Sequence, residues 1–274
     1  MPKLSIITVN LNNREGLRKT AESVVSQTYK DYEWIVIDGG STDGSKELIE
    51  QYAEHISYWV SEPDKGIYNA MNKGILKARG EYCFFLNSGD YFIDGNSLQK
   101  AFDLDFTEDV VYGYSKFDRG DHFEIKASPR EITLRTFVES TIHHTGNVFI
   151  RRELFNEDKY GLYDETLKIV SDWKWFLQAL GLSTATARYI DEMMSVFDCT
   201  GISETQRDLL HEEREMVLKE VIKERILLDY MKFSNIEDAL FEQEKKIRGS
   251  LSYKIGSFVL APFRCIKNFL RRFQ

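Results

Sequence analysis

The sequence of 274 residues contains few of the residues that mark fibrous, disulfide-rich or membrane-spanning proteins. Only 4 prolines and 17 glycines are present, which excludes a fibrous or linker-dominated chain. The 3 cysteines lie far apart without a CxxC pair, so we expect neither a disulfide framework nor a zinc site. No apolar run approaches the about 20 residues of a membrane span, and no signal peptide precedes the strand-like segment Leu4–Val9. These absences predict a cytoplasmic protein.

The hydrophobic fraction of 42% and the aromatic fraction of 13% are sufficient for a large folded core. The net charge of −8 is distributed unevenly along the chain. Residues 245–274 contain eight basic residues and no acidic one, so residues 1–244 carry −16. The acidic body argues against nucleic acid as a partner, whereas the basic C-terminal segment predicts an anionic surface as a partner.

The basic C-terminal segment also has an amphipathic pattern. From Ile255 onward, apolar residues at helical spacing, four phenylalanines among them, fall in one arc, and basic residues fall on the opposite side. This pattern is typical of a helix that lies in the plane of an anionic membrane surface. The alternative is a helix that packs on the body or on another subunit. We expect a peripheral protein on the cytosolic face of the inner membrane.

The first 90 residues alternate between strand-like and helix-like segments. The predicted strands are Leu4–Val9, Tyr32–Ile37, Ile56–Ser61 and Tyr82–Leu86, and the predicted helices are Arg14–Gln27, Asp43–His55 and Gly66–Ala78. Strands that alternate with helices of this length predict a parallel sheet with helices on its faces. Ligands of such sheets bind outside the carboxyl ends of the strands.

The rest of the chain is less regular and ends in helices. We expect strands at Val110–Tyr114, Asn147–Ile150, Ala185–Ile190 and Met194–Phe197, and helices at Ser171–Leu180, Glu204–Met231 and Ile236–Ile247. The sequence therefore predicts an α/β domain over residues 1–203, a helical extension over 204–248 and the basic tail over 249–274. The helices of the extension could pack on the core or pair two subunits.

Polar, turn-forming clusters follow all four strands of the first 90 residues. They are Asn10–Asn13, Asp38–Asp43, Glu62–Gly66 and Asn87–Asp90. Because the carboxyl ends of parallel strands meet at one edge of the sheet, we expect these four clusters to form one site.

Four motifs in this order carry a family resemblance. They are Ser5–Asn10, Val36–Gly44, Ala70–Gly74 and Phe85–Asp90. Together they resemble the family 2 glycosyltransferases with the GT-A fold, a Rossmann-like mixed and mostly parallel sheet, over about residues 3–200. Within that family the sequence is most similar to bacterial enzymes of capsule, exopolysaccharide or lipopolysaccharide assembly. The resemblance implies inverting transfer of a sugar from a nucleotide-diphosphate sugar, expected to be a UDP-sugar, to a saccharide or lipid-linked acceptor.

The resemblance also implies a nucleotide-binding site at the strand ends. Asp38 stands where the family places the carboxylate that accepts the imide N–H of the nucleobase, and Asp64 and Lys65 could contact the nucleobase or ribose. The alternative for Asp38–Asp43 is a tight turn with a helix cap. The further donor-binding candidates are Thr8, Asn10, Asn87, Ser88 and Gly89.

A metal ion is expected beside the diphosphate, because the leaving group gains negative charge in the transition state. Family members commonly carry Asp-x-Asp or Asp-x-Asp-Asp at this point, whereas this sequence has Asn87-Ser88-Gly89-Asp90. Only the last acid remains, so Asp90 is the predicted ligand of Mg²⁺ or Mn²⁺, which prefer oxygen donors.

The catalytic base is expected at Asp172. The segment Ile169–Phe176 resembles the family's segment that carries the base, although the helix dipole alone also favours an acid in a first turn. Trp173 or Trp175 is expected to form a wall of the acceptor site. His143 and His144 are candidates for contacts with the diphosphate or the acceptor.

Two alternatives belong to other functional classes. A nucleotidyltransferase has a similar sheet, but it usually opens with a glycine-rich phosphate loop, which Asn10–Arg14 is not. A catalytically weak relative that binds nucleotide or scaffolds an assembly is favoured by the depleted acidic motif. Asp172, at the position where a base is needed, argues against this second alternative.

Overall fold

The computed structural model of the chain describes residues 1–250, apart from the side chains at positions 202, 238 and 249. The predicted amphipathic tail lies almost entirely outside the described residues. Contacts divide the chain into two compact units, Met1–Leu218 and a second unit that begins at Lys219. The first unit therefore runs 15 residues past the boundary expected at residue 203. Within residues 1–250, no helix is long and apolar enough to cross a membrane.

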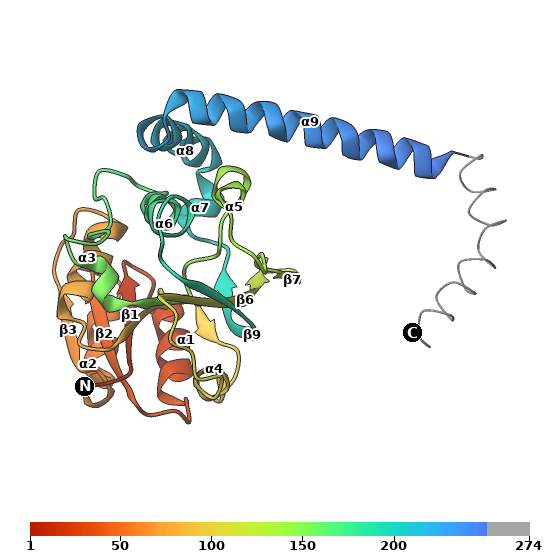
Figure 1. The fold of residues 1–274 in the computed structure, drawn as a ribbon. Coiled ribbons are helices and arrows are strands. Elements are labelled where there is room, and N and C mark those ends of the chain that lie inside the picture. The colour runs from red at the N-terminus through yellow and green to blue at the C-terminus, as the bar shows by residue number, and fades with distance from the viewer. Residues whose placement is uncertain (251–274) are drawn as a thin grey trace, which may run out of the picture. The chain divides into compact units, whose positions relative to one another are not determined.

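Within the described residues, nine strands form one sheet in the order β3-β2-β1-β4-β8-β6-β9-β5, and β7 pairs with β6 (Figure 1). Strands β1 to β4 run parallel to one another, whereas β8 is antiparallel to both β4 and β6. This mixed α/β sheet confirms the predicted fold class. The strands are β1 Leu4–Asn10, β2 Tyr32–Asp38, β3 Tyr58–Ser61, β4 Tyr82–Phe85, β5 Tyr91–Phe92, β6 Val110–Asp118, β7 Phe123–Lys126, β8 Val148–Arg151 and β9 Ala187–Asp198.

Helices cover both faces of the sheet (Figure 1). Since successive side chains of a strand point to opposite faces, Ile6 and Ile7 of β1 contact different helices. Ile6 belongs to the core formed with α1 (Arg14–Val25), α2 (Ser45–Gln51) and α4 (Ser97–Phe102). Ile7 lies against Gly74 of α3 (Ile67–Lys77) on the other face. The remaining helical segments of the first unit are Ala53–His55, α5 Leu134–Glu139, Arg152–Phe155, α6 Ser171–Phe176, Leu177–Gly181, α7 Ile202–Thr205 and most of α8 Arg207–Val221.

Two predicted boundaries are wrong. The two strands expected between residues 185 and 197 form a single strand, β9, which stays paired to β6 through two register shifts. The expected helices Glu204–Met231 and Ile236–Ile247 are replaced by α7, α8 and α9 (Glu224–Gly249), with a non-helical residue, Lys223, before α9. Neither glycine nor proline occurs near residue 223, so the sequence contains no local sign of this break.

A buried carboxylate ties the first two strands to the turn before β4. Glu33 accepts hydrogen bonds from Ser5 Oγ at 2.7 Å, from the backbone of Arg79 and Gly80, and from the Arg79 side chain at 2.9 Å. Burial opposes ionisation, but the hydrogen bonds from Ser5 and Arg79 and the charge of Arg79 lower the pKa of Glu33 overall. This network holds β1 and β2 in register with the turn before β4, so that the carboxyl ends of these strands meet at one edge of the sheet.

We expect Gly80→Ala to destabilise the fold, because a Cβ at this position would lie 2.5 Å from the backbone nitrogen of Ser5. Strand β1 would have to move, and overpacking of this kind lowers the free energy of unfolding by about 1–3 kcal/mol. Urea unfolding of both proteins measures the loss. Gly201→Ala is the control, since a Cβ there has nothing within 4 Å. Equal losses in the two variants would contradict the packing argument.

Candidate active site

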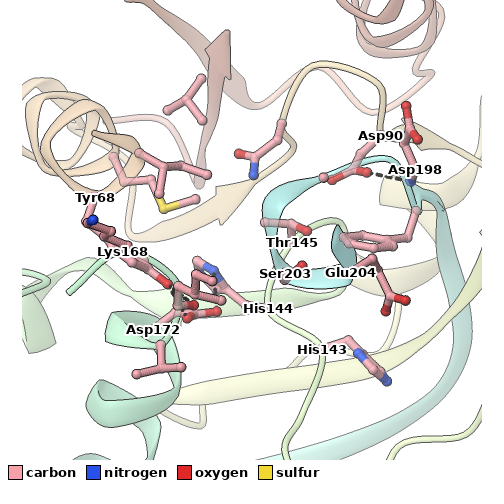
Figure 2. Close-up of a pocket in the computed structure, with 18 of the residues that line it drawn as sticks. Tyr68, Asp90, His143, His144, Thr145, Lys168, Asp172, Asp198, Ser203 and Glu204 are labelled. Atoms are coloured by element: carbon pink, nitrogen blue, oxygen red, sulfur yellow. Dashed lines mark hydrogen bonds and ion pairs between the residues drawn. The ribbon is translucent and has the colours of Figure 1, made fainter. Parts of the chain in front are cut away.

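A cavity of about 670 Å³ opens at the carboxyl ends of the parallel strands (Figure 2). Its volume is in the range of pockets that bind small molecules. The sheet edge and the segments around His144 and Asp172 together form its wall. Nine of the predicted site residues line it: Asn10, Asp64, Asn87, Ser88, Asp90, His143, His144, Asp172 and Trp173. Four others, Thr8, Asp38, Lys65 and Gly89, are not part of the lining.

Asp38 lies at the end of β2, directly behind the lining of the cavity. Its fully buried carboxylate accepts from Asn10 Nδ2 at 2.7 Å, from the hydroxyl and backbone N–H of Ser41, and from Ser61 Oγ at 2.6 Å. Burial raises the pKa, but the hydrogen bonds from Ser41, Ser61 and Asn10 outweigh it and lower the pKa of Asp38. All four lone-pair sites of the carboxylate are occupied. A nucleobase can reach this carboxylate only by displacing one of these donors.

The other nucleotide-binding candidates differ in their access to the cavity. Thr8 is fully buried and accepts a hydrogen bond from Trp34 Nε1 at 3.0 Å, so its side chain belongs to the core. Asp64 lines the cavity and packs so closely on Gly39 that a Cβ there would lie 2.5 Å from its carboxylate. Lys65 is exposed outside the lining.

Two amide oxygens at the strand ends have no hydrogen-bond partner among residues 1–250. Asn10 uses its amide nitrogen to hold Asp38 and Ser41, which leaves Oδ1 buried without a donor. Oδ1 of Asn87 is also buried and without a donor. Buried polar atoms are nearly always hydrogen-bonded. Because both residues line the cavity, the two oxygens can accept from, or coordinate, a bound molecule.

Asp90 forms a pair with Asp198, which the sequence analysis did not assign to the site. Asp90 Oδ1 accepts from the backbone N–H of Asp198 at 2.9 Å, as the dashed line in Figure 2 shows. Burial raises the pKa of Asp90 to about 7. Hydrogen bonds from the Asp198 backbone and from Thr145 lower this pKa, whereas the nearby charge of Asp198 raises it. Gly89 has a φ of +106°, and a Cβ there would lie 2.6 Å from the Asp198 carboxylate. Glycine at 89 thus permits the approach of Asp198.

The donor atoms at this edge fit a hard divalent cation. The carboxylates of Asp90 and Asp198 and the orphaned Oδ1 of Asn87 supply oxygen, which Mg²⁺ and Mn²⁺ prefer. Among the described residues, no group of three or more His, Cys, Asp or Glu side chains could hold a metal ion. A bound ion would therefore take part of its coordination from a ligand such as a diphosphate.

Asp172 stands in the first turn of α6 on another part of the wall. Its side chain is 25% exposed, and Oδ1 accepts a hydrogen bond from the Tyr68 hydroxyl at 2.7 Å. The same hydroxyl lies 2.5 Å from the carbonyl oxygen of Ile169. Burial, together with the charge of Asp172, raises the pKa of Tyr68 well above its usual value, so Tyr68 acts as a neutral donor. Asp172 is thus an oriented, accessible carboxylate, as general base catalysis requires.

His143 and His144 are both neutral near pH 7, because burial lowers their pKa values to about 4. His144 Nε2 lies 2.9 Å from the Tyr163 hydroxyl, and Nδ1 lies 3.5 Å from Asp172 Oδ2. The second distance is too long for a formed hydrogen bond, in agreement with Nδ1 having no hydrogen-bond partner. A Tyr163 hydroxyl that donates to Nε2 places the ring proton on Nδ1, toward Asp172. His143 packs edge-on against Phe117.

Trp173 and Arg214 complete this part of the wall. Trp173 Nε1 donates to the carbonyl oxygen of Phe137 at 2.9 Å, and the Arg214 guanidinium lies 4.6 Å from the centre of the Trp173 ring. No role was predicted from the sequence for Tyr68, Asp198 or Arg214. Asp198 is the last residue of β9 and could have been found by the rule that selected the other strand ends. Tyr68 and Arg214 reach the cavity through tertiary contacts that leave no local pattern.

Comparison with known proteins identifies relatives of the sequence. The model of the family "Glycosyl transferase family 2" matches residues 5–159. An uncharacterized glycosyltransferase of Mycobacterium tuberculosis is 32% identical over 208 residues, which cover 73% of this chain and 77% of the relative. A PGL/p-HBAD biosynthesis glycosyltransferase of Mycobacterium bovis is 27% identical over 216 residues, which cover 74% of this chain and 80% of the relative.

Solved structures confirm the GT-A fold. Residues 1–349 of Staphylococcus aureus TarS, in complex with UDP, match with a TM-score of 0.60 at 20% identity, covering 80% of this chain and 70% of that one. In another TarS crystal structure the match spans only 42% of the TarS chain. The mannosyltransferase PcManGT of Pyrobaculum calidifontis, in complex with GDP-Man and Mn²⁺, matches with a TM-score of 0.55 at 15% identity, covering 95% and 84%.

The raised pKa of Asp90 predicts a pH-dependent effect of Asp90→Asn. A carboxyl with a pKa of about 7 when folded and about 3.9 when unfolded stabilises the fold below pH 3.9. That stabilisation is lost as the pH rises through 7. We expect wild type to lose about 3 kcal/mol relative to Asp90→Asn between pH 5 and pH 8.

Urea unfolding at both pH values, in buffer with EDTA to remove divalent cations, measures this difference. Asp103→Asn, at an exposed position outside the cavity, is the matched control for the loss of one carboxylate. A constant difference between wild type and Asp90→Asn across this range would contradict the burial of a proton-holding carboxyl.

Proposed function

Because this chain belongs to glycosyl transferase family 2 and is a glycosyltransferase, we propose that it inverts the anomeric centre as it transfers a sugar from a UDP-sugar. The acceptor is a hydroxyl of a saccharide or lipid-linked molecule in the assembly of a cell-surface polysaccharide, including lipopolysaccharide. The observation that carries the proposal is the oriented carboxylate of Asp172, held by Tyr68 in the same cavity as the paired acids Asp90 and Asp198.

The donor is proposed to bind at the strand ends. Asn10, Asp64 and Asn87 present polar groups to the cavity there, and Ser88 and Gly89 form the adjoining turn. Asp38 is the proposed partner of the nucleobase, by exchange of one of its present donors, and the exposed Lys65 is a nearby candidate. No contact with the nucleotide is proposed for Thr8, whose side chain belongs to the core. The UDP and UDP-GlcNAc complexes of TarS support UDP as the nucleotide.

A divalent cation is proposed at Asp90 and Asp198. Five acidic residues line the cavity, against Lys168 and Arg214 as the basic ones among the described residues, so a diphosphate would enter an acidic environment. Bound Mg²⁺ or Mn²⁺ would offset this repulsion and stabilise the charge on the departing diphosphate. The Mn²⁺ in the PcManGT structure supports this assignment.

Asp172 is the proposed base of a single displacement. Its carboxylate accepts the proton of the acceptor hydroxyl, while the hydroxyl oxygen attacks the anomeric carbon and forms the new glycosidic bond. The bond between that carbon and the phosphate oxygen breaks, and UDP leaves with the electron pair. Tyr68 holds Oδ1, which leaves Oδ2 for the acceptor. Trp173 forms the adjacent wall of the proposed acceptor site, where His143 and His144 are neutral groups.

The proposed place of the reaction is the cytosolic face of the inner membrane. The basic segment, eight positive charges in residues 245–274, would bring the enzyme to an anionic lipid surface. A relative that acts in PGL/p-HBAD biosynthesis supports a lipid-linked acceptor.

The alternative of a catalytically weak nucleotide-binding relative keeps its sequence argument, the acidic motif reduced to Asp90. Asp198 weighs against it, because this second carboxylate lies beside Asp90 and restores a pair of acids. Turnover decides between the two.

Asp172→Asn should lower the rate of UDP release from UDP-GlcNAc and other UDP-sugars, with water as the acceptor, by roughly 10²–10⁴-fold. Tyr68→Phe removes only the hydroxyl that orients the base and should lower the rate about tenfold, which corresponds to one charge-assisted hydrogen bond. Tyr112→Phe is the matched control, since Tyr112 is also buried but donates to Pro129 O outside the cavity. Equal rates in wild type and Asp172→Asn would remove Asp172 from the mechanism.

UDP should stabilise the chain against thermal unfolding, and Mn²⁺ should increase the effect. A ligand at 100 times its dissociation constant adds about 2.7 kcal/mol. We expect Asp90→Ala and Asp198→Ala to abolish the increment due to Mn²⁺, while Asp191→Ala, 71% exposed and outside the cavity, retains it. Scanning calorimetry with UDP, GDP and each metal makes the measurement. Absence of any nucleotide-induced shift would argue for the scaffold alternative.

A further inference from the structure

Arg214 is a half-buried cation of α8 with an unusual set of partners. Its Nη2 donates to the carbonyl oxygens of Phe137 at 2.8 Å and Ser140 at 2.5 Å, and its guanidinium stacks over Trp173. Burial lowers the pKa of Arg214, against the opposing effect of the charge of Asp172. The head group is therefore held in a fixed position by neutral groups.

No carboxylate in the described part of the chain lies within ion-pair distance of Arg214, and its Nε and Nη1 have no protein acceptor there. Arg119, in contrast, forms ion pairs with both Glu124 and Glu204. A buried charge without a counter-charge is unfavourable. The unfavourable arrangement at Arg214 would be relieved by an anionic ligand.

Arg214 lines the same cavity as Asp172 and Lys168. We propose that Arg214 binds a phosphate group of a substrate in this cavity. Both hydrogens of Nη2 are used by the two carbonyl oxygens, so Nε and Nη1 are the donors left for phosphoryl oxygens, and the guanidinium stays charged even when partly buried. Trp173 and the two carbonyl oxygens hold it in place before the ligand arrives, so little side-chain entropy is lost on binding.

The proposed function offers two molecules that could supply this phosphate, so this step rests on that function. One is the diphosphate of the nucleotide-sugar donor. The other is the phosphate of a lipid-linked acceptor, whose reactive hydroxyl must lie close to Asp172 and hence to Arg214. Both sources present phosphoryl oxygens to the guanidinium. UDP itself occupies Arg214 only if the diphosphate of the donor is the ligand, and it leaves Arg214 free if the phosphate of the acceptor is the ligand.

The test is calorimetric titration of wild type, Arg214→Gln and Arg214→Lys with UDP, with uridine, and with inorganic pyrophosphate before and after saturation with UDP. Arg207→Gln is the matched control, since Arg207 lies on the same helix but is 68% exposed and outside the lining. If the donor supplies the phosphate, Arg214→Gln should weaken UDP about tenfold or more and leave uridine unchanged. If the acceptor supplies it, UDP binding should be unchanged, while pyrophosphate binding to the UDP-saturated protein should be lost.

Arg214→Lys retains the charge but not the Nε and Nη1 donors and should show a smaller loss. Unchanged binding of both UDP and pyrophosphate in Arg214→Gln would overturn the proposal. Unchanged uridine binding and an unchanged unfolding midpoint exclude misfolding as the cause of a loss. A wild-type chain that binds no UDP would refute the proposed function, whereas the pyrophosphate titration would still test Arg214 by itself.

Discussion

The cavity depends on the four hydrogen bonds that the buried carboxylate of Asp38 accepts. These bonds join Asn10 at the end of β1, Ser41 in the loop after β2, and Ser61 at the end of β3. A carboxylate without such donors could not remain ionised in the interior. The same bonds fix Asn10 so that its amide nitrogen points to Asp38 and its oxygen has no partner in the described part of the chain. The internal order of the sheet edge thus determines which atoms the cavity can offer to a ligand.

The chemistry proposed for the cavity is divided between two places. Asp90 and Asp198 lie on one side in Figure 2, and Tyr68, Lys168 and Asp172 lie on the other. In each place the surroundings control the charge or the direction of an acid: burial, aided by the charge of Asp198, raises the pKa of Asp90, and a neutral hydroxyl orients Asp172. The separation keeps the carboxylate proposed to accept a proton away from the two proposed to hold a cation.

Hydrophobic periodicity was sufficient to predict the four parallel strands and the edge at which Asn10, Asp64 and Asn87 meet. It could not predict that Asp38 would face inward with every lone pair occupied, because this depends on Ser61, which lies 23 residues away. Tyr68 and Asp172 are 104 residues apart and meet only when α3 and α6 pack on the same face of the sheet. The approach of Asp198 to Gly89 depends on the positive φ angle of Gly89. The break before α9 could not be predicted, because no glycine or proline lies near it in the sequence.

The hydroxyl of Tyr68 has one hydrogen but lies within hydrogen-bonding distance of two acceptors, Ile169 O at 2.5 Å and Asp172 Oδ1 at 2.7 Å. While Asp172 is ionised, one hydrogen must serve both contacts. Once the proton of the acceptor is on Oδ2, the carboxyl is neutral and Oδ1 becomes a weaker hydrogen-bond acceptor. Tyr68 can then donate more fully to Ile169, without movement of any heavy atom. The loss of charge at Asp172 would thus be passed through Tyr68 to a backbone carbonyl that is in place before the reaction begins.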